Sequence, residues 1–201
     1  MLPFFAPKTV EKYREYTQEL CRKLIREFIE DGQPDVAGEY ARQIPQRIIA
    51  RILGIDPEDG RRLVEEPEFI PSAVEEFLRA YSPVTMESIA TQDPVLGDQL
   101  VKEGERIVLS FPASSRDPPT FENPEEVIID RQVNRHIAFG SGILRYAGSN
   151  LARLEMQIAI CEFLAMVPEL EREDPGAVTW AGGQVQGTRY LSVIFPTSQN
   201  S

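Results

Sequence analysis

Apolar residues recur at helical spacing near the start of the chain. Between Val10 and Ile29 they keep to one side of a predicted helix, at Tyr13, Leu20, Leu24 and Phe28. Gly32 and Pro34 follow this stretch. Because glycine and proline favour chain positions just after a helix, we expect the helix to end before them.

A second amphipathic stretch covers residues 36–53 and is followed by Gly54. Pro45 is expected to bend this helix, because proline cannot complete the helical hydrogen bonding. Its apolar side carries Ile44, Ile48, Ile49 and Ile52. A short third helix is predicted to start at the cap Asp56 and to run through Leu63.

The fourth helix is predicted to begin near Pro71 and to stop before Pro83, with Ser72 and Glu75 at the spacing of a capping box. After it the pattern changes to that of strands. Residues 96–99 read Leu-Gly-Asp-Gln, which predicts a tight hairpin within residues 89–101, and residues 106–111 alternate as a further strand does.

A proline-rich coil is expected over residues 112–134, before a long helix from about Ala147 to Met166. The tail then predicts a hairpin that turns at Gly182 and Gly183. The order predicts a mainly α fold with a small β part (α+β). We expect one domain over 1–201, with N-terminal helices in 1–66 and the fourth helix, small sheet, long helix and hairpin in 67–201.

Composition and charge limit the partners of this chain. Of its 201 residues 42% are hydrophobic and 26% charged, as in globular proteins, and no apolar run has the length of a membrane span. The net charge of −11 opposes binding to nucleic acid or to an anionic membrane surface, since both need a basic face. The first residues lack the pattern of a signal peptide, so a cytoplasmic location is expected.

Few residues offer metal or redox chemistry. Cys21 and Cys161 both lie in apolar, helix-like segments without zinc-site spacing, so both are expected to be buried thiols. Glu76 and Arg79 are three apart and can pair on one helical face, which by itself contributes only about 0.2–0.5 kcal/mol.

The sequence around Glu76 and Arg79 makes the pair more informative. AVEEFLRAYSPVTM, residues 113–155 and VTWAGGQVQGTRYLSVIF closely resemble three consecutive regions of bacterial cytochromes P450, in order and spacing. Glu76 and Arg79 match the family's ExxR pair, and LAR at 151–153 matches the start of its long helix. Its haem loop, FGxGxHxCxG, is matched by Phe139, Gly140, Gly142 and Gly148. The resemblance implies a cytochrome P450 fold.

The departures from the family all affect haem. Tyr146 stands where the family has the cysteine thiolate that binds haem iron. Leu144 and Ser88 stand where it usually has groups that face the haem propionates. The chain also passes from GRRLVEEP directly into EFIPSAVEEFLR, where the family inserts several helices, including the one that activates oxygen. The resemblance thus implies a partial fold, shortened at its start and internally deleted.

Two roles are open for Tyr146. Tyrosinate binds haem iron in catalase, so Tyr146 is a candidate metal ligand. A phenol with a pKa near ~10 must then lose its proton near neutral pH, which needs nearby positive charge; Arg145 and Arg153 are candidates. The ring is also larger than a cysteine side chain. We therefore expect Tyr146 to be an aromatic packing or surface residue, and the protein to hold no cofactor, or haem if any.

The resemblance also sets expectations for the residues around the pair. In the family a third arginine usually joins the ExxR pair. Glu126 stands at one common place for it, and Arg131 is near enough to substitute. His136, the one histidine, precedes the loop and is expected to have a hydrogen-bonded structural role rather than a catalytic one.

Three functions are compatible with these observations. The resemblance alone implies a haem-dependent monooxygenase that works with a redox partner, but its required residues are replaced. A haem-free auxiliary or binding protein is the second, similar to cytochrome P450-like activators of glycosyltransferases. A gene remnant without activity is the third. Helices that lose their central partners leave apolar faces uncovered, which favours association, so a homodimer is compatible with each.

Overall fold

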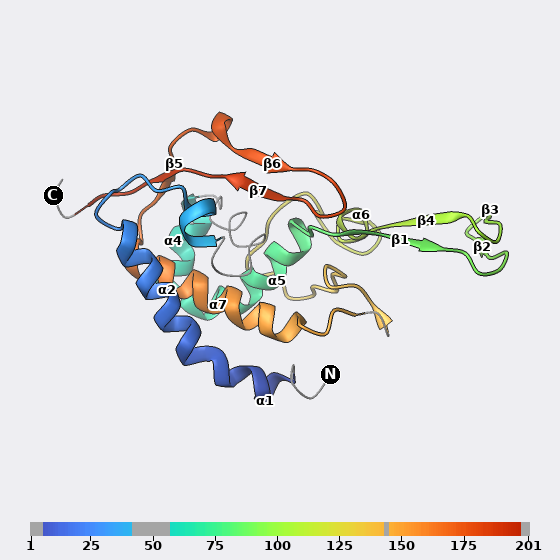
Figure 1. The fold of residues 1–201 in the computed structure, drawn as a ribbon, viewed down its shortest axis with the longest axis horizontal. Coiled ribbons are helices and arrows are strands. Elements are labelled where there is room, and N and C mark those ends of the chain that lie inside the picture. The colour runs from blue at the N-terminus through green and yellow to red at the C-terminus, as the bar shows by residue number, and fades with distance from the viewer. Residues whose placement is uncertain (1–5, 42–56, 143–144, 198–201) are drawn as a thin grey trace.

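The computed structural model describes residues 6–41, 57–142 and 145–197 (Figure 1). The predicted bend at Pro45, the cap Asp56 and the replaced loop position Leu144 lie outside these ranges, as do Ile44, Ile48, Ile49 and Ile52.

The N-terminal part is helical. Short turns, α1 (Pro7–Val10) and η2 (Glu11–Tyr13), lead into α2 (Arg14–Phe28), and η3 (Ala37–Ala41) follows. Then come α4 (Pro57–Glu65), η4 (Pro67–Phe69) and α5 (Ile70–Ala80). The predicted helix at 10–29 is confirmed, except that Tyr13 was wrongly placed on its apolar side and is 48% exposed.

In the described ranges the β part consists of four antiparallel strand pairs. The ribbon of β1 (Thr85–Ile89) and β4 (Arg106–Ser110) carries at its end the small hairpin of β2 (Val95–Leu96) and β3 (Gln99–Leu100). Gly97, with φ of 60°, turns this hairpin as predicted. Near the C-terminus, β5 (Glu171–Arg172) pairs with β8 (Val193–Ile194), and β6 (Thr179–Ala181) with β7 (Gly187–Tyr190).

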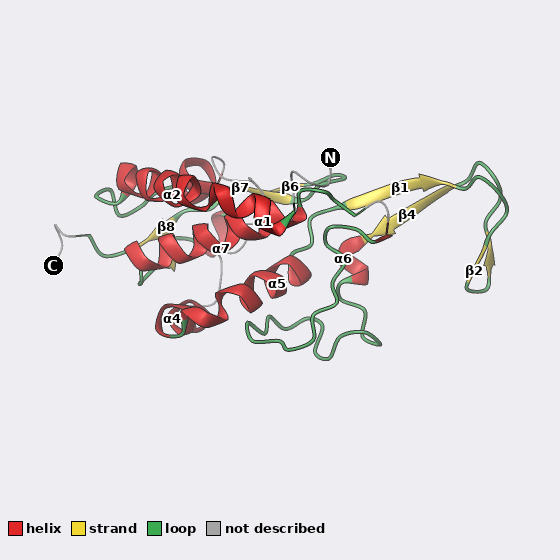
Figure 2. Ribbon diagram, turned by 90° about the horizontal axis from the view of Figure 1, so that it is seen from below, coloured by secondary structure: helices red, strands yellow, loops and turns green. Residues whose placement is uncertain are grey.

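The predicted coil contains one short helix, α6 (Phe111–Ser114), and a turn, η6 (Pro175–Ala177), precedes β6. The long helix is α7 (Ser149–Met166), two residues shorter at its start than predicted. The mainly helical fold with a small β part is confirmed. Figures 1 and 2 show a helical body from which the β1–β4 ribbon projects.

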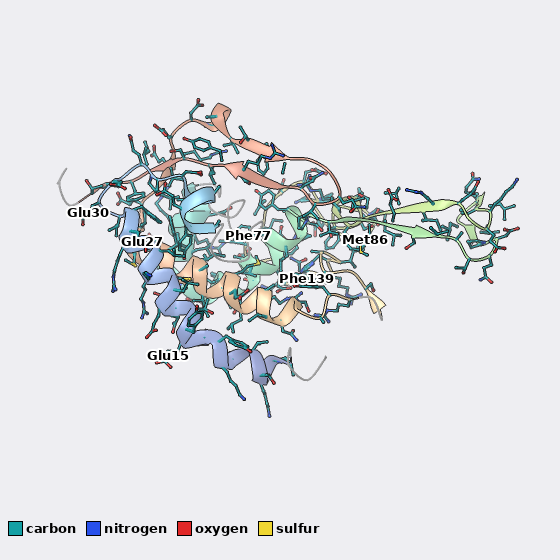
Figure 3. The ribbon with its side chains drawn as sticks, viewed as in Figure 1. Glu15, Glu27, Glu30, Phe77, Met86 and Phe139 are labelled. Carbon is teal, nitrogen blue, oxygen red and sulfur yellow. The ribbon has the colours of Figure 1, made fainter. Side chains whose placement is uncertain are left out.

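The core forms around α7, which packs against α2, α5 and α4. The rings of Phe28 and Phe163 lie 6.5 Å apart, and Tyr40 packs against both. The Tyr40 hydroxyl donates to the carbonyl of Ala159 at 2.9 Å, which satisfies a polar group inside the core. Figure 3 shows Phe77 within this body, whereas Met86 lies on the projecting ribbon.

The two cysteines differ. Cys21 is fully buried, and burial raises the pKa of its thiol to about 11. Cys161 is exposed, which corrects the expectation that both thiols are buried. The reason is that α7 carries apolar residues around most of its circumference, so its sequence does not indicate which side lacks a neighbour.

No helix in the described part of the chain is long and apolar enough to cross a membrane.

Candidate functional site

The predicted pair of Glu76 and Arg79 is fully buried on α5. Arg79 donates to both carboxylate oxygens of Glu76, at 2.9 and 2.8 Å. It also donates to three backbone carbonyls of the coil, those of Ser115, Pro124 and Glu126. A bidentate, fully satisfied pair of this kind fixes the coil against the helix, because either partner left alone would be a buried charge.

Arg131 completes this network. Its Nε lies 2.9 Å from Glu76, and the side-chain amide of Asn134 donates to the same carboxylate at 3.0 Å. Arg131 is therefore the third arginine that the resemblance implies, while Glu126 offers only its backbone carbonyl. Burial alone would raise the pKa of Glu76, but the hydrogen bonds from Arg79 and Arg131 lower it below its ordinary value.

A second network surrounds the neighbouring carboxylate, Glu75. Arg153 of α7 binds it in bidentate fashion at 2.6 and 3.0 Å, and Nε2 of His136 lies 3.0 Å from it. The Nδ1 atom of His136 accepts from the backbone N–H of Ala138 at 3.2 Å, so Nε2 carries the proton and donates to Glu75. His136 is thus hydrogen-bonded, as predicted.

The charge of Glu75 is strongly stabilised. Burial by itself would raise its pKa, but the hydrogen bonds from His136 and Arg153 outweigh burial and hold the pKa at about 2. This role corrects the predicted capping box, because Glu75 points to α7 and the hydroxyl of Ser72 donates to the carbonyl of Phe69 instead. The paired acids in AVEEFLR were the sequence signal for two networks.

The loop of residues 138–148 joins these networks to α7. Gly140 and Gly142 adopt φ of 75° and 62°, a conformation that side-chain-bearing residues rarely adopt. The backbone N–H of Tyr146 donates to the carbonyl of Phe139 at 2.8 Å and closes the loop. The retained glycines therefore still shape a turn in front of α7.

Phe139 lies between two side chains. The ring of Tyr146 stacks on it, with centroids 6.1 Å apart and planes inclined by 24°. The guanidinium of Arg153 also lies over the Phe139 ring, 4.7 Å from its centroid. Arg153 thus contacts Phe139 and Glu75 together and connects the loop to α5.

Tyr146 itself folds back on its own loop. A Cβ atom built on Gly148 would lie 2.8 Å from the phenolic oxygen, so Gly148 is required for the position of this ring. The residue is 61% exposed. The Arg153 side chain, one of the two candidates to activate the phenol, is bound to Glu75 and to the carbonyl of Ser149, and Arg145 is exposed.

The connection between α4 and α5 is very short. Only Glu66 separates α4 from η4, and η4 runs directly into α5. Arg62 secures this connection, because it donates to Asp130 of the coil at 2.7 Å and lies over the ring of Phe69 at 4.6 Å. Ser88, the other replaced position, is half-buried in β1.

The described residues contain no group of three or more histidine, cysteine, aspartate or glutamate side chains placed to hold a metal ion. The two charged networks instead join α5, the coil and α7 through arginines.

A comparison with protein families matches residues 51–166 of this chain to the model described as Cytochrome P450. The chain belongs to the cytochrome P450 family. Among curated relatives, Cytochrome P450 105A3 of Streptomyces carbophilus is 32% identical over 192 residues, which cover 88% of this chain and 47% of that protein. The polyketide biosynthesis cytochrome P450 PksS of Bacillus subtilis is 43% identical over 116 residues, 57% of this chain and 29% of PksS.

Solved structures agree on the fold. Cytochrome P450 CYP101C1 superposes with a TM-score of 0.90 at 21% identity, over 98% of this chain and 74% of that one. P450BioI, solved in complex with an acyl carrier protein that carries a hexadecenoic acid, gives 0.89 at 21% identity, over 97% of this chain and 77% of that one.

The comparisons also show how much of a cytochrome P450 this chain spans. The chain spans about half or less of the length of these curated cytochromes P450. The solved structure of PksS matches with a TM-score of 0.85 at 22% identity, over 98% of this chain and 77% of that one.

Proposed function

We propose that this cytochrome P450 chain does not act as a haem-thiolate monooxygenase and serves instead as a haem-free binding or auxiliary protein. The observation that carries this proposal is the ion pair between Arg153 and Glu75. A tyrosinate ligand would need a nearby cation that favours the ionised phenol, and the guanidinium of Arg153 is already paired with the ionised Glu75.

The environment of Tyr146 supports the same conclusion. A haem ligand is normally oriented by neighbouring groups in a dry pocket, whereas Tyr146 is 61% exposed and lies against its own loop. The connection through Glu66 leaves no room in the described sequence for the oxygen-activating helix of the family. These residues do not fit a haem iron.

A binding role is supported by what the chain keeps. The networks around Glu75 and Glu76 are intact and hold α5, the coil and α7 together. Buried charges are costly unless they are paired, and the carboxylates of Glu75 and Glu76 are paired with arginines, which favours a folded protein over a remnant. The net charge of −11 favours a partner with a basic or neutral surface, in the cytoplasm.

Titration of the purified protein with haemin, followed by absorption in the Soret region, tests the proposal. We expect no saturable change at one haemin per chain, and the same result for Tyr146→Phe and for a control, Tyr190→Phe, at another exposed tyrosine. A stoichiometric Soret change that Tyr146→Phe removes and Tyr190→Phe retains would identify a haem protein and overturn the proposal.

A second measurement separates an auxiliary protein from a remnant. We expect the isolated chain to unfold in one cooperative thermal transition, and to do so at a higher temperature with its partner bound. Gradual unfolding without a transition would contradict an auxiliary role.

A further inference from the structure

The β1–β4 ribbon projects from the helical body, and the outer edge of β4 is open (Figures 1 and 2). On the other side of the ribbon, the backbone N–H of Thr85 in β1 donates to the carbonyl of Gln184 at 2.9 Å, so the loop between β6 and β7 covers the start of that edge. Among the described residues, β1 is the one strand that pairs with β4. The ribbon therefore offers β4 as an edge for further pairing.

The direction of the backbone groups on β4 follows from its ladder with β1. Beside the ladder, the N–H of Ala90 donates to the carbonyl of Glu105 at 2.9 Å. Along two antiparallel strands such hydrogen-bonded pairs alternate with pairs that are not hydrogen-bonded. By this alternation every second residue of β4 directs its N–H and C=O away from β1, namely Arg106, Val108 and Ser110. Backbone groups that point outwards in this way can bind a further strand.

β4 lacks the bulges, prolines and central charges that commonly keep strand edges apart. Its register with β1 is continuous over its five residues, and none of them is proline. Its one charged residue, Arg106, stands at its end and is paired with Glu87 of β1 at 3.1 Å. Val108 and Leu109 are exposed apolar side chains on opposite faces of the ribbon. This edge therefore favours pairing with another strand.

The sequence of β4 is complementary to itself. If β4 pairs antiparallel over its full length with β4 of a second copy, Val108 of each copy falls opposite Val108 of the other, on a twofold axis. Val108 points outwards in both copies, so the two residues form a hydrogen-bonded pair. Ile107 then faces Leu109 of the other copy, which is an apolar cross-strand pair on both sides of the axis, and Arg106 faces Ser110. No like charges are opposed.

β1 does not fit a second copy of itself in this way. Full-length antiparallel pairing of two β1 strands would place Glu87 opposite Glu87, and like charges directly opposite each other destabilise a sheet. Gln184 also binds the start of that edge. Self-association is therefore expected at β4 and not at β1.

We propose that two copies of this chain associate through the outer edges of their β4 strands and form one four-stranded antiparallel sheet, in the order β1–β4–β4–β1. The net charge of −11 opposes association, but at an ionic strength of about 0.15 M this repulsion is screened beyond about 8 Å. The dimer involves neither haem nor the loop 138–148, so it forms whether or not the proposed function is correct.

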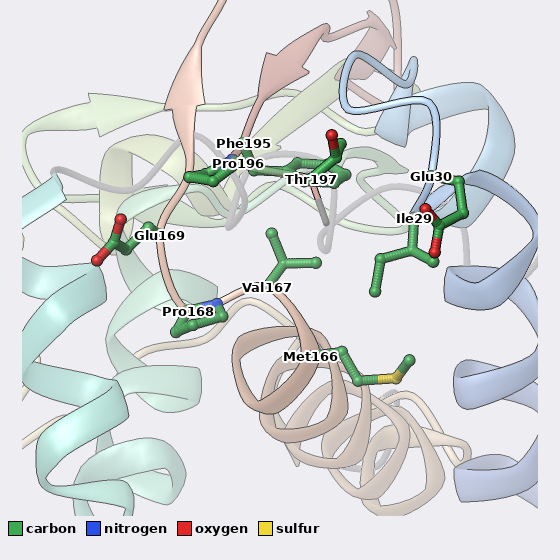
Figure 4. A pocket seen from close by; sticks show the side chains of 9 residues that line it. All are labelled: Ile29, Glu30, Met166, Val167, Pro168, Glu169, Phe195, Pro196 and Thr197. Atoms are coloured by element: carbon green, nitrogen blue, oxygen red, sulfur yellow. The ribbon is translucent and has the colours of Figure 1, made fainter. Parts of the chain in front are cut away.

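The dimer leaves one hollow of the body uncovered. A pocket of about 370 Å³ lies at the end of α7, lined by residues 29–30, 166–169 and 195–197 (Figure 4). Figures 1 and 2 show this end of α7 on the side of the body away from the ribbon. Pairing of the ribbons therefore does not close the pocket.

Sedimentation velocity of the full chain at rising concentration tests the proposal, with a shift from monomer to dimer as the expected result. Val108→Pro removes the N–H that points to the second copy and keeps the bonds to β1, and proline is tolerated at such edge positions. It should weaken dimerisation at least about tenfold, since each dimer loses both hydrogen bonds between the two Val108 residues. Ile89→Pro makes the matching change at the outer edge of β1 and should leave dimerisation unchanged.

Two results of this experiment would overturn the proposal. One is a chain that stays monomeric up to about 1 mM. The other is an equal loss of dimer in the Val108→Pro and Ile89→Pro variants, which would place the contact elsewhere. A thermal transition recorded for each variant shows that it is folded.

Disulfide trapping gives a second measurement that does not depend on proline. In a hydrogen-bonded antiparallel pair the Cα atoms lie about 5.5 Å apart, a distance that a disulfide can bridge. With the exposed Cys161 replaced by serine, Val108→Cys should form a covalent dimer when diamide oxidises the two thiols. Ile89→Cys in the same background should stay monomeric, although positions 89 and 108 are similarly exposed, at 64% and 61%. Equal cross-linking of the two variants would indicate random collision and overturn the proposal.

Discussion

Replacement of Glu75 with glutamine tests the network that joins α5 to α7. The change keeps the shape of the side chain and removes the negative charge that Arg153 and His136 contact. The pKa of Glu75 is about 2, against an ordinary value of 4.5. Since each pKa unit corresponds to about 1.4 kcal/mol, the charge contributes about 3 kcal/mol to the free energy of unfolding at neutral pH.

The sign of the pH dependence follows from the same values. The folded pKa lies below the unfolded one, so this contribution is complete above about pH 4.5 and is lost as the pH falls towards 2. By linkage about 2 kcal/mol of it disappears between pH 7 and pH 3. Glu75→Gln should therefore be about 3 kcal/mol less stable than the original chain at pH 7 and only about 1 kcal/mol less stable at pH 3.

Urea unfolding followed by circular dichroism at pH 7, 4 and 3 measures these differences. Glu19→Gln is the matched control, because it makes the same chemical change at an exposed position of α2. The fully buried carboxylate of Glu76 is present in all three proteins, so its own acid titration cancels in the comparison. The reasoning is refuted if Glu75→Gln and the original chain lose stability in parallel between pH 7 and pH 3.

Two other predictions follow from burial. Arg131→Leu removes a partner from the fully buried Glu76 and should lower the free energy of unfolding by about 3–5 kcal/mol, whereas Arg106→Leu, at an exposed pair with Glu87, should cost less than about 1 kcal/mol. Equal losses in urea unfolding would contradict this. In the folded protein Ellman's reagent should modify Cys161 alone, and Cys21 only after unfolding, because Cys21 is fully buried; prompt reaction of both thiols would contradict the core described above.

The sequence predicted local features well. The hairpin at Gly97 and the end of α5 before Pro83 depend on residues next to one another in the chain, and both are confirmed. The sequence offered Arg131 as the third arginine beside Glu76 and Arg79, and the structure places its Nε within hydrogen-bond distance of Glu76.

Contacts between distant residues were harder to predict. Glu75 was assigned to its own helix end, yet its partner Arg153 is 78 positions away, a distance at which periodicity carries no information. Exposure of Cys161 was missed for a related reason, since it depends on which neighbours α7 has and not on α7 itself. The roles of Tyr146, Phe139, Gly140, Gly142 and Gly148 in cofactor binding stay predictions that the haemin titration tests.

The connection at Glu66 has a consequence for where the chain can accept added residues. Arg62 binds Asp130 and packs on Phe69 only because α4 and α5 are adjacent at this point. A segment inserted between the two helices would have to separate groups that now stabilise each other. The short connection is therefore expected to tolerate insertions poorly.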